Sequence, residues 1–111
     1  MAGKFELKKA KNGQFMFNLK AGNGEIILTS EMYKAKSGAM NGIDSVKENA
    51  KKADSFKVLA SKKGEPYFVL RAGNNQVIGT SETYSSESAM KNGMESVKKT
   101  APGAAVDDMT K

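Results

Sequence analysis

The chain has 111 residues, enough for one domain with a modest core, and it contains no cysteine and no histidine. These absences exclude disulfide bonds, thiolate metal sites, cysteine nucleophiles and Ser-His-Asp catalysis. They also remove the side chain most often used as a general base near neutral pH. We therefore expect no catalytic residue, no metal and no cofactor.

The net charge of +6 is unevenly distributed along the chain. Residues 1–20 carry five lysines against one glutamate, and residues 55–80 carry four basic residues against one glutamate. The remaining segments are close to neutral. No apolar run is long enough to cross a membrane, and the first residues lack the apolar stretch of a signal peptide, so we expect a cytoplasmic protein without membrane contact.

An internal repeat organises the sequence. A shift of 51 residues aligns residues 4–50 with residues 55–101 without a gap, and about 20 of the 47 positions are identical. Two copies are too few for a solenoid. The repeat therefore predicts a single pseudo-two-fold domain over residues 1–111, with a short C-terminal strand or tail at 102–111.

The first half of each copy has the pattern of an antiparallel meander. Apolar residues alternate with polar ones at 4–8 and again at 15–20, which is the period of a half-buried strand. Glycine-containing turns at 12–13 and 22–24 separate these strands from each other and from a short third strand at 25–28. The second copy repeats the same pattern.

The second half of each copy changes to a helical period. Apolar residues recur at spacings of four, three and four, at Ala39, Ile43, Val46 and Ala50 and again at Met90, Met94, Val97 and Ala101. We expect the first helix to begin near Lys34 and the second to be N-capped by Ser85. The predicted fold is α+β: tandem βββα(β) repeats that form one antiparallel sheet with two helices packed on one face.

Several motifs together resemble the YegP-like family of small bacterial proteins. In the first copy they are Leu19-Lys20-Ala21-Gly22-Asn23-Gly24, Thr29-Ser30-Glu31 with Tyr33, and Asn41-Gly42-Ile43 followed by Ser45-Val46-Lys47; the second copy repeats most of them. The resemblance implies tandem β₃αβ units that exchange their last strands, with residues 104–107 as the final strand. It also implies a fused dimer of a single unit, and it supplies no catalytic residue and no ligand.

Two motifs retained in both copies have alternative interpretations. Thr-Ser-Glu-x-Tyr at 29–33 and 80–84 either forms a paired polar site with Glu31 and Glu82 as acids, or organises the junction between strand and helix. In the second case Ser and Glu satisfy free helix N–H groups and the tyrosine packs with a hydrogen-bonded hydroxyl. The Asn-Gly pairs at 41–42 and 92–93 either bind a ligand, or the amide bonds to neighbouring backbone while the glycine permits close packing.

A basic strand face is the remaining candidate site. If the large apolar residues face the helices, strand alternation turns several cations outward, together with residues of a hairpin tip. The candidate basic binding face comprises Lys8, Lys20, Lys57, Lys62, Lys63, Tyr67 and Arg71. Positive charge beside an exposed aromatic ring is one way to bind nucleic acid. The other interpretation is a solvated surface whose lysines protect the sheet edges.

These patterns favour a non-enzymatic binding or assembly module that uses an open sheet face or edge. The partner is an unidentified macromolecule, a protein or a nucleic acid, and the chain is a monomer (a fused pseudo-dimer) or a weak homo-oligomer. The alternative is sequence-tolerant nucleic-acid binding through the basic strand face. An enzyme that uses only carboxylates and lysines is a third hypothesis, and no pair of acids at useful spacing supports it.

Overall fold

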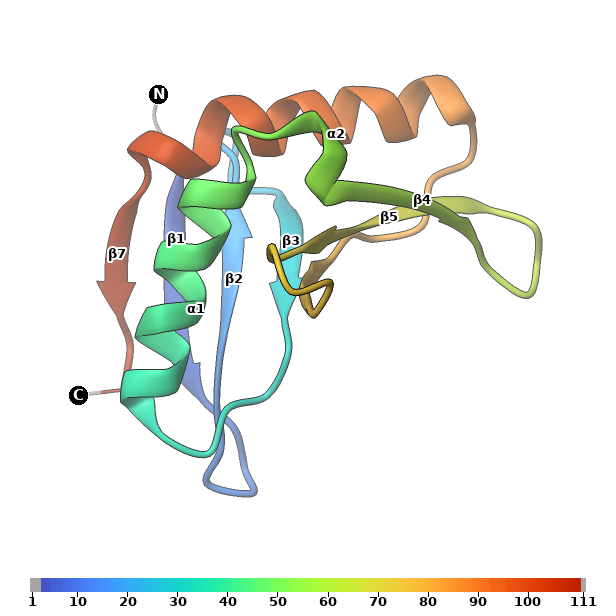
Figure 1. The fold of residues 1–111 in the computed structure, drawn as a ribbon. Coiled ribbons are helices and arrows are strands. Elements are labelled where there is room, and N and C mark those ends of the chain that lie inside the picture. Colours follow the sequence, from blue (N-terminus) through green and yellow to red (C-terminus); the bar gives the residue numbers. More distant parts are fainter. Residues whose placement is uncertain (1–2, 111) are drawn as a thin grey trace.

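The computed structural model describes residues 3–110, apart from the side chain of residue 53. Seven strands form one sheet in the order β4-β5-β6-β3-β2-β1-β7 (Figure 1). Along the chain the elements are β1 (Lys4–Lys9), β2 (Phe15–Lys20), β3 (Ile26–Ser30), α1 (Lys36–Asn49), the 3-10 turn η1 (Ala53–Ser55), β4 (Phe56–Ala60), β5 (Pro66–Arg71), β6 (Val77–Thr80), α2 (Glu87–Thr100), the 3-10 turn η2 (Ala101–Gly103) and β7 (Ala105–Asp108).

The turns that close the meanders are built alike in the two copies. Asn23 and Asn74 each accept a hydrogen bond, at 3.1 and 3.0 Å, from the N–H two residues on. The residue directly after each of these asparagines has positive φ: Gly24 at 86° and Asn75 at 69°. Glycine and asparagine are the residues that adopt this conformation with least strain, so the substitution between the copies preserves the turn.

Both helices have 14 residues and begin 51 positions apart, but their N-termini differ. The hydroxyl of Ser86 accepts a hydrogen bond from the N–H of Ala89 at 3.1 Å. The predicted cap at Ser85 was therefore wrong by one residue, because Ser86 is the extended residue directly before the helix. The helix α1 starts at Lys36, two residues later than predicted, since Ala35 precedes it without a side-chain cap.

The core lies between the helices and one face of the sheet. Three phenylalanines, Phe5, Phe17 and Phe68, are fully buried there with Ile43 of α1 and Met90 of α2. Figure 1 shows α1 in front of β1 and β2, and α2 running across the top of the view from above β4 and β5 toward β7. The predicted α+β architecture, with two helices on one face, is confirmed. The opposite face of the sheet carries no helix in the described structure.

The last strand crosses from the second copy to the first. β7 pairs with β1 in parallel, with Phe5 opposite Val106 and Glu6 opposite Asp107. All other neighbouring strands pair antiparallel, so the sheet is mixed through this one addition. The crossing of the last strand to the other copy, implied by the family resemblance, is confirmed for the second copy, and this strand runs one residue later than expected. The first copy has no equivalent crossing strand in the described structure.

Candidate functional site

The two edges of the repeat, β1 and β4, occupy equivalent positions but are covered differently. β7 pairs with four residues of β1, whereas β4 is the last strand of the sheet among the described residues. Leu7 on β1 is 0% exposed, and Val58, which aligns with it in the second copy, is 52% exposed. The open edge of β4 is therefore a structural difference between two copies that share most of their fold.

Hydrogen bonding along β4 determines which backbone groups face this open edge. The N–H of Ser61 donates to the carbonyl of Glu65 at 2.9 Å. Because bonded and non-bonded pairs alternate along antiparallel strands, Val58 belongs to a non-bonded pair, and its N–H and C=O point away from β5. The same alternation on β1 directs the carbonyl of Leu7 to the N–H of Met109, at 2.8 Å. Val58 thus presents unpaired groups where Leu7 is paired.

A buried carboxylate compensates the basic residues of the first copy. Glu6 is 6% exposed on the helix-free face. Its oxygens lie 3.5 Å from the nitrogens of Lys4 and Lys8 and 3.1 Å from that of Lys20. Burial favours the neutral acid, but the three lysines, Lys20 foremost, hold the pKa of Glu6 below its ordinary value. Glu6 thus offsets part of the positive charge on β1 and β2.

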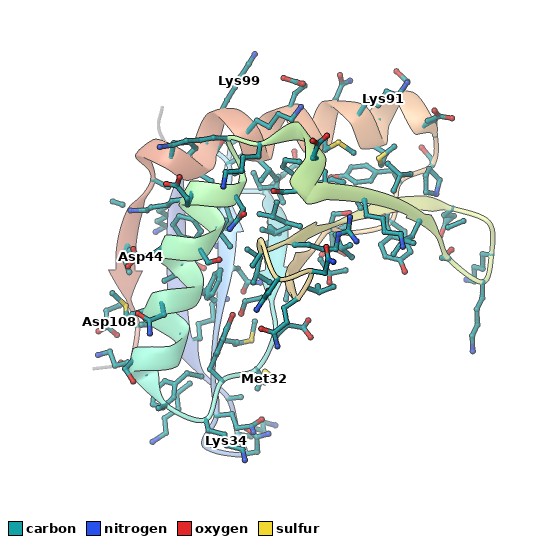
Figure 2. All side chains as sticks on the ribbon, in the orientation of Figure 1. Met32, Lys34, Asp44, Lys91, Lys99 and Asp108 are labelled. Carbon is teal, nitrogen blue, oxygen red and sulfur yellow. The ribbon has the colours of Figure 1, made fainter. Side chains whose placement is uncertain are left out.

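Two acidic residues fix β7 to the first copy. Lys4 bonds Asp107 at 3.2 Å, and this bond raises the pKa of Lys4. At the end of β7, Asp108 pairs with Lys36 at the start of α1, where Figure 2 shows it beside the helix. Asp108 also accepts hydrogen bonds from Thr110, and Lys36 and Thr110 together hold its pKa well below the usual range. An acidic strand therefore lies on a lysine-bearing edge.

The second copy lacks this compensation. Lys57 stands where the first copy has Glu6, and Arg71 stands where it has Lys20. In residues 3–110 neither cation forms an ion pair. The Nε atom of Arg71 is buried without a hydrogen-bond partner. Because an unpaired buried donor costs about 1–3 kcal/mol, this side chain is left in an unfavourable state.

The seven residues of the predicted basic face fall into two groups. One group, on β1 and β2, is Lys8 and Lys20; the other, on β4, β5 and their turn, is Lys57, Lys62, Lys63, Tyr67 and Arg71. β6 and β3 lie between the two groups in the sheet. Glu6 contacts both lysines of the first group, whereas within residues 3–110 no carboxylate pairs with a cation of the second group. The seven residues therefore do not form one continuous patch.

The Thr-Ser-Glu-x-Tyr motif stabilises strands rather than helix ends. The hydroxyl of Ser30 accepts from the N–H of Phe17 at 2.8 Å and donates to the carbonyl of Glu31, and Ser81 repeats both bonds. Glu31 and Glu82 are exposed and line neither the cleft beside Arg71 nor the one beside Tyr84. The prediction that Ser and Glu satisfy helix N–H groups was wrong, because four residues lie between the glutamate of each motif and the first residue of the helix.

The tyrosines of the motif pack against helical glycines. A Cβ on Gly42 would lie 2.5 Å from the hydroxyl oxygen of Tyr33, and a Cβ on Gly93 would lie 2.1 Å from that of Tyr84. The predicted role of these glycines in close packing is confirmed, and burial raises the pKa of both tyrosines. The asparagines that precede the glycines are exposed. In the described part of the chain neither they nor the tyrosine hydroxyls form the predicted hydrogen bonds.

A metal cluster and a membrane-spanning helix are both absent from residues 3–110. No group of three or more acidic, cysteine or histidine side chains is placed to hold a metal ion. The helices of the described structure are too short and too polar to span a membrane.

Comparison with known proteins places the chain in a family. A family model described as "Domain of unknown function (DUF1508)" matches residues 10–56 and again residues 61–108. The UPF0339 protein YegP of Yersinia pestis is 55% identical over 108 residues, which cover 97% of this chain and 96% of that protein. The chain belongs to the UPF0339 (YegP) family. The resemblance seen in the sequence motifs is thereby confirmed.

Solved structures of the YegP family have the same fold. The solution structure of UPF0339 protein SO3888 from Shewanella oneidensis is 50% identical and superposes with a TM-score of 0.93, covering 99% of this chain and 93% of that one. The solution structure of yegP from E. coli is 44% identical, with a TM-score of 0.94 and coverage of 99% and 95%. The names of these relatives attribute no enzymatic activity and no nucleic acid to them, so the nucleic-acid alternative draws no support from the comparisons.

The open edge of β4 was not predicted from the sequence. Val58 aligns with the core residue Leu7, so its position in the repeat predicts burial. The aligned copies did contain one usable signal. The second copy has Lys57 where the first copy has Glu6, and this difference reverses the charge at a strand position. The alignment of the copies could have identified that reversal without a structure.

Proposed function

We propose that the chain is a non-enzymatic binding module that takes up an extended segment of a partner protein as an additional strand beside β4. The observation that carries this proposal is the contrast between the two equivalent edges: β1 is covered by β7, and β4 is open with Val58 exposed. Addition of a strand to a free sheet edge is a common mode of peptide recognition.

Fusion of the two copies explains why one edge is open. β7 spans residues 105–108, and the shift of 51 residues places its counterpart at 54–57. Residues 54 and 55 lead into β4, and residues 56 and 57 are its first two residues, so this segment cannot also lie beside β4. A pair of separate units has two exchange strands, whereas the fused chain retains one. The edge of β4 keeps the position that an exchange strand would cover.

The chemistry of the incoming segment follows from β7. On β1, Val106 lies opposite the buried Phe5 and Asp107 lies opposite Glu6. On β4 the equivalent positions are Phe56, which is half-buried, and the uncompensated Lys57. A parallel segment with an apolar residue followed by acidic residues therefore complements both the exposed apolar surface and the positive charge of β4.

A peptide with the sequence of residues 103–110, blocked at both ends, is a direct probe of this edge. In a ¹⁵N-labelled protein we expect it to shift the amide signals of Phe56, Val58 and Ala60. Val58→Pro removes the outward N–H without breaking a bond to β5, and proline is tolerated on edge strands, so this variant should fold and lose the shifts. Val58→Thr keeps the N–H and should retain them.

Three results would refute strand addition by a partner. Absence of shifts at β4 in the wild type, or equal shifts in Val58→Pro, would exclude the edge. Equal binding of a peptide with both aspartates changed to lysine would exclude the acidic segment. A dimer in light scattering that Val58→Pro dissociates would make a second copy of this chain the occupant.

We also expect the partner to be met in the cytoplasm, which cell fractionation tests.

A further inference from the structure

We infer that the cleft beside Arg71 is a binding site for an oxyanion group, a carboxylate or a phosphate. The cleft lies between the segment that joins α1 to β4 and the turn that joins β5 to β6. Its volume is about 420 Å³, and it is lined by Lys52, Asp54, Ser55, Arg71, Ala72, Gly73 and Asn75. This site goes beyond the proposed strand binding, because a small anion can occupy it without a strand beside β4.

The lining has the donors that an oxyanion requires. Lys52 and Arg71 supply positive charge, and the Asn75 amide supplies a neutral donor group, while the Ser55 hydroxyl donates to Asn49 at 3.5 Å. Asp54 is the one acid in the lining, and it forms no ion pair with either cation within the described residues. The planar guanidinium group matches the geometry of a carboxylate or a phosphate better than any other side chain does.

Comparison of the two copies shows that Arg71 lacks a counter-ion. Its counterpart Lys20 has the carboxylate of Glu6 at 3.1 Å. At the position of Glu6 the second copy has Lys57, which adds a positive charge in place of a negative one. Arg71 is also the residue whose buried Nε has no partner. Within this fold the equivalent cation has an internal acid, and an anionic ligand in the cleft would give Arg71 the same kind of partner.

An NMR titration at constant ionic strength tests the site, with inorganic phosphate and acetate as separate probes and chloride as the reference. We expect shifts confined to the amides of residues 52–55 and 71–75, and the stronger of the two anions identifies the class of ligand. Arg71→Gln should weaken binding roughly tenfold, the loss of a charge-assisted hydrogen bond. Lys62→Gln removes the same charge from the exposed hairpin turn outside the cleft and should leave the affinity nearly unchanged.

A second variant tests the comparison between the copies. Lys57→Glu recreates the arrangement of the first copy, so its carboxylate should pair with Arg71 and weaken anion binding. The site is refuted if neither anion binds above chloride, or if the shifts spread over all lysines. It is also refuted if Arg71→Gln folds, as judged by its spectrum, and binds like the wild type. Val58→Pro should leave anion binding intact, which separates a failure of this site from a failure of strand addition.

Discussion

Truncation of the equivalent residues Leu7 and Val58 should have very different costs. Leu7→Ala removes three carbon atoms from a fully buried position. At ~0.8 kcal/mol for each buried methylene plus a cavity term, we expect a loss of about 3 kcal/mol. Val58→Ala removes two carbon atoms from a side chain that is 52% exposed, so the loss should be about 0.5–1 kcal/mol. About 0.8 kcal/mol of the difference comes from the extra carbon atom of leucine, and the rest reflects the greater burial on the edge that β7 covers.

Urea unfolding followed by far-UV circular dichroism measures both losses as changes in the free energy of unfolding. The measurement should be made at two protein concentrations, because self-association through β4 would bury Val58. Losses that agree within about 0.5 kcal/mol would refute the open edge. A loss at Val58 that grows with protein concentration would show that a second copy covers it.

Three further predictions concern the packing and the attachment of β7. Gly93→Ala places a methyl group 2.1 Å from the hydroxyl oxygen of Tyr84, so we expect a loss of about 1–3 kcal/mol in urea unfolding, which Tyr84→Phe should partly relieve. Ser30→Ala leaves the buried N–H of Phe17 without its acceptor and should cost about 1–3 kcal/mol in the same assay; a loss near zero would contradict the role of the hydroxyl. The lowered pKa of Asp108 means that the unfolded chain binds its proton more readily, so the stabilisation by Asp108 is present at neutral pH and is lost as the pH falls below about 4. Asp108→Asn should remove this part of the pH dependence of the unfolding midpoint, and an unchanged profile would contradict it.

Patterns within one copy were sufficient to predict the strands and helices. The alternation around Phe5 and Phe17 placed both side chains on the helix-facing side, where they are buried. The retained glycines at 42 and 93 correctly indicated close approach, because no side chain fits against the tyrosines. These features are local, or they join a helix to strands of the same copy. The spacing of apolar residues, and the residues that are identical in both copies, are therefore enough to indicate them.

Features that depend on the register of the sheet, or on the relation between copies, could not be predicted from periodicity. The hydroxyls of Ser30 and Ser81 bond to neighbouring strands, and only the register of the sheet determines this. Val58 is exposed because the strand that would cover it is absent, which no property of its own segment indicates. The candidate site therefore depends on an asymmetry between the two copies, because β7 covers β1 and no strand covers β4 in the described structure.

Amide hydrogen exchange of Val58 and Leu7 in the isolated protein, measured by NMR, tests the open edge of β4 most directly. Both N–H groups point away from the neighbouring hairpin strand, and β7 covers only the edge on which Leu7 lies. We predict that the N–H of Leu7 is strongly protected and that the N–H of Val58 exchanges at close to the rate of an unfolded chain. Protection of Val58 equal to that of Leu7 would contradict the open edge and the proposed mode of binding.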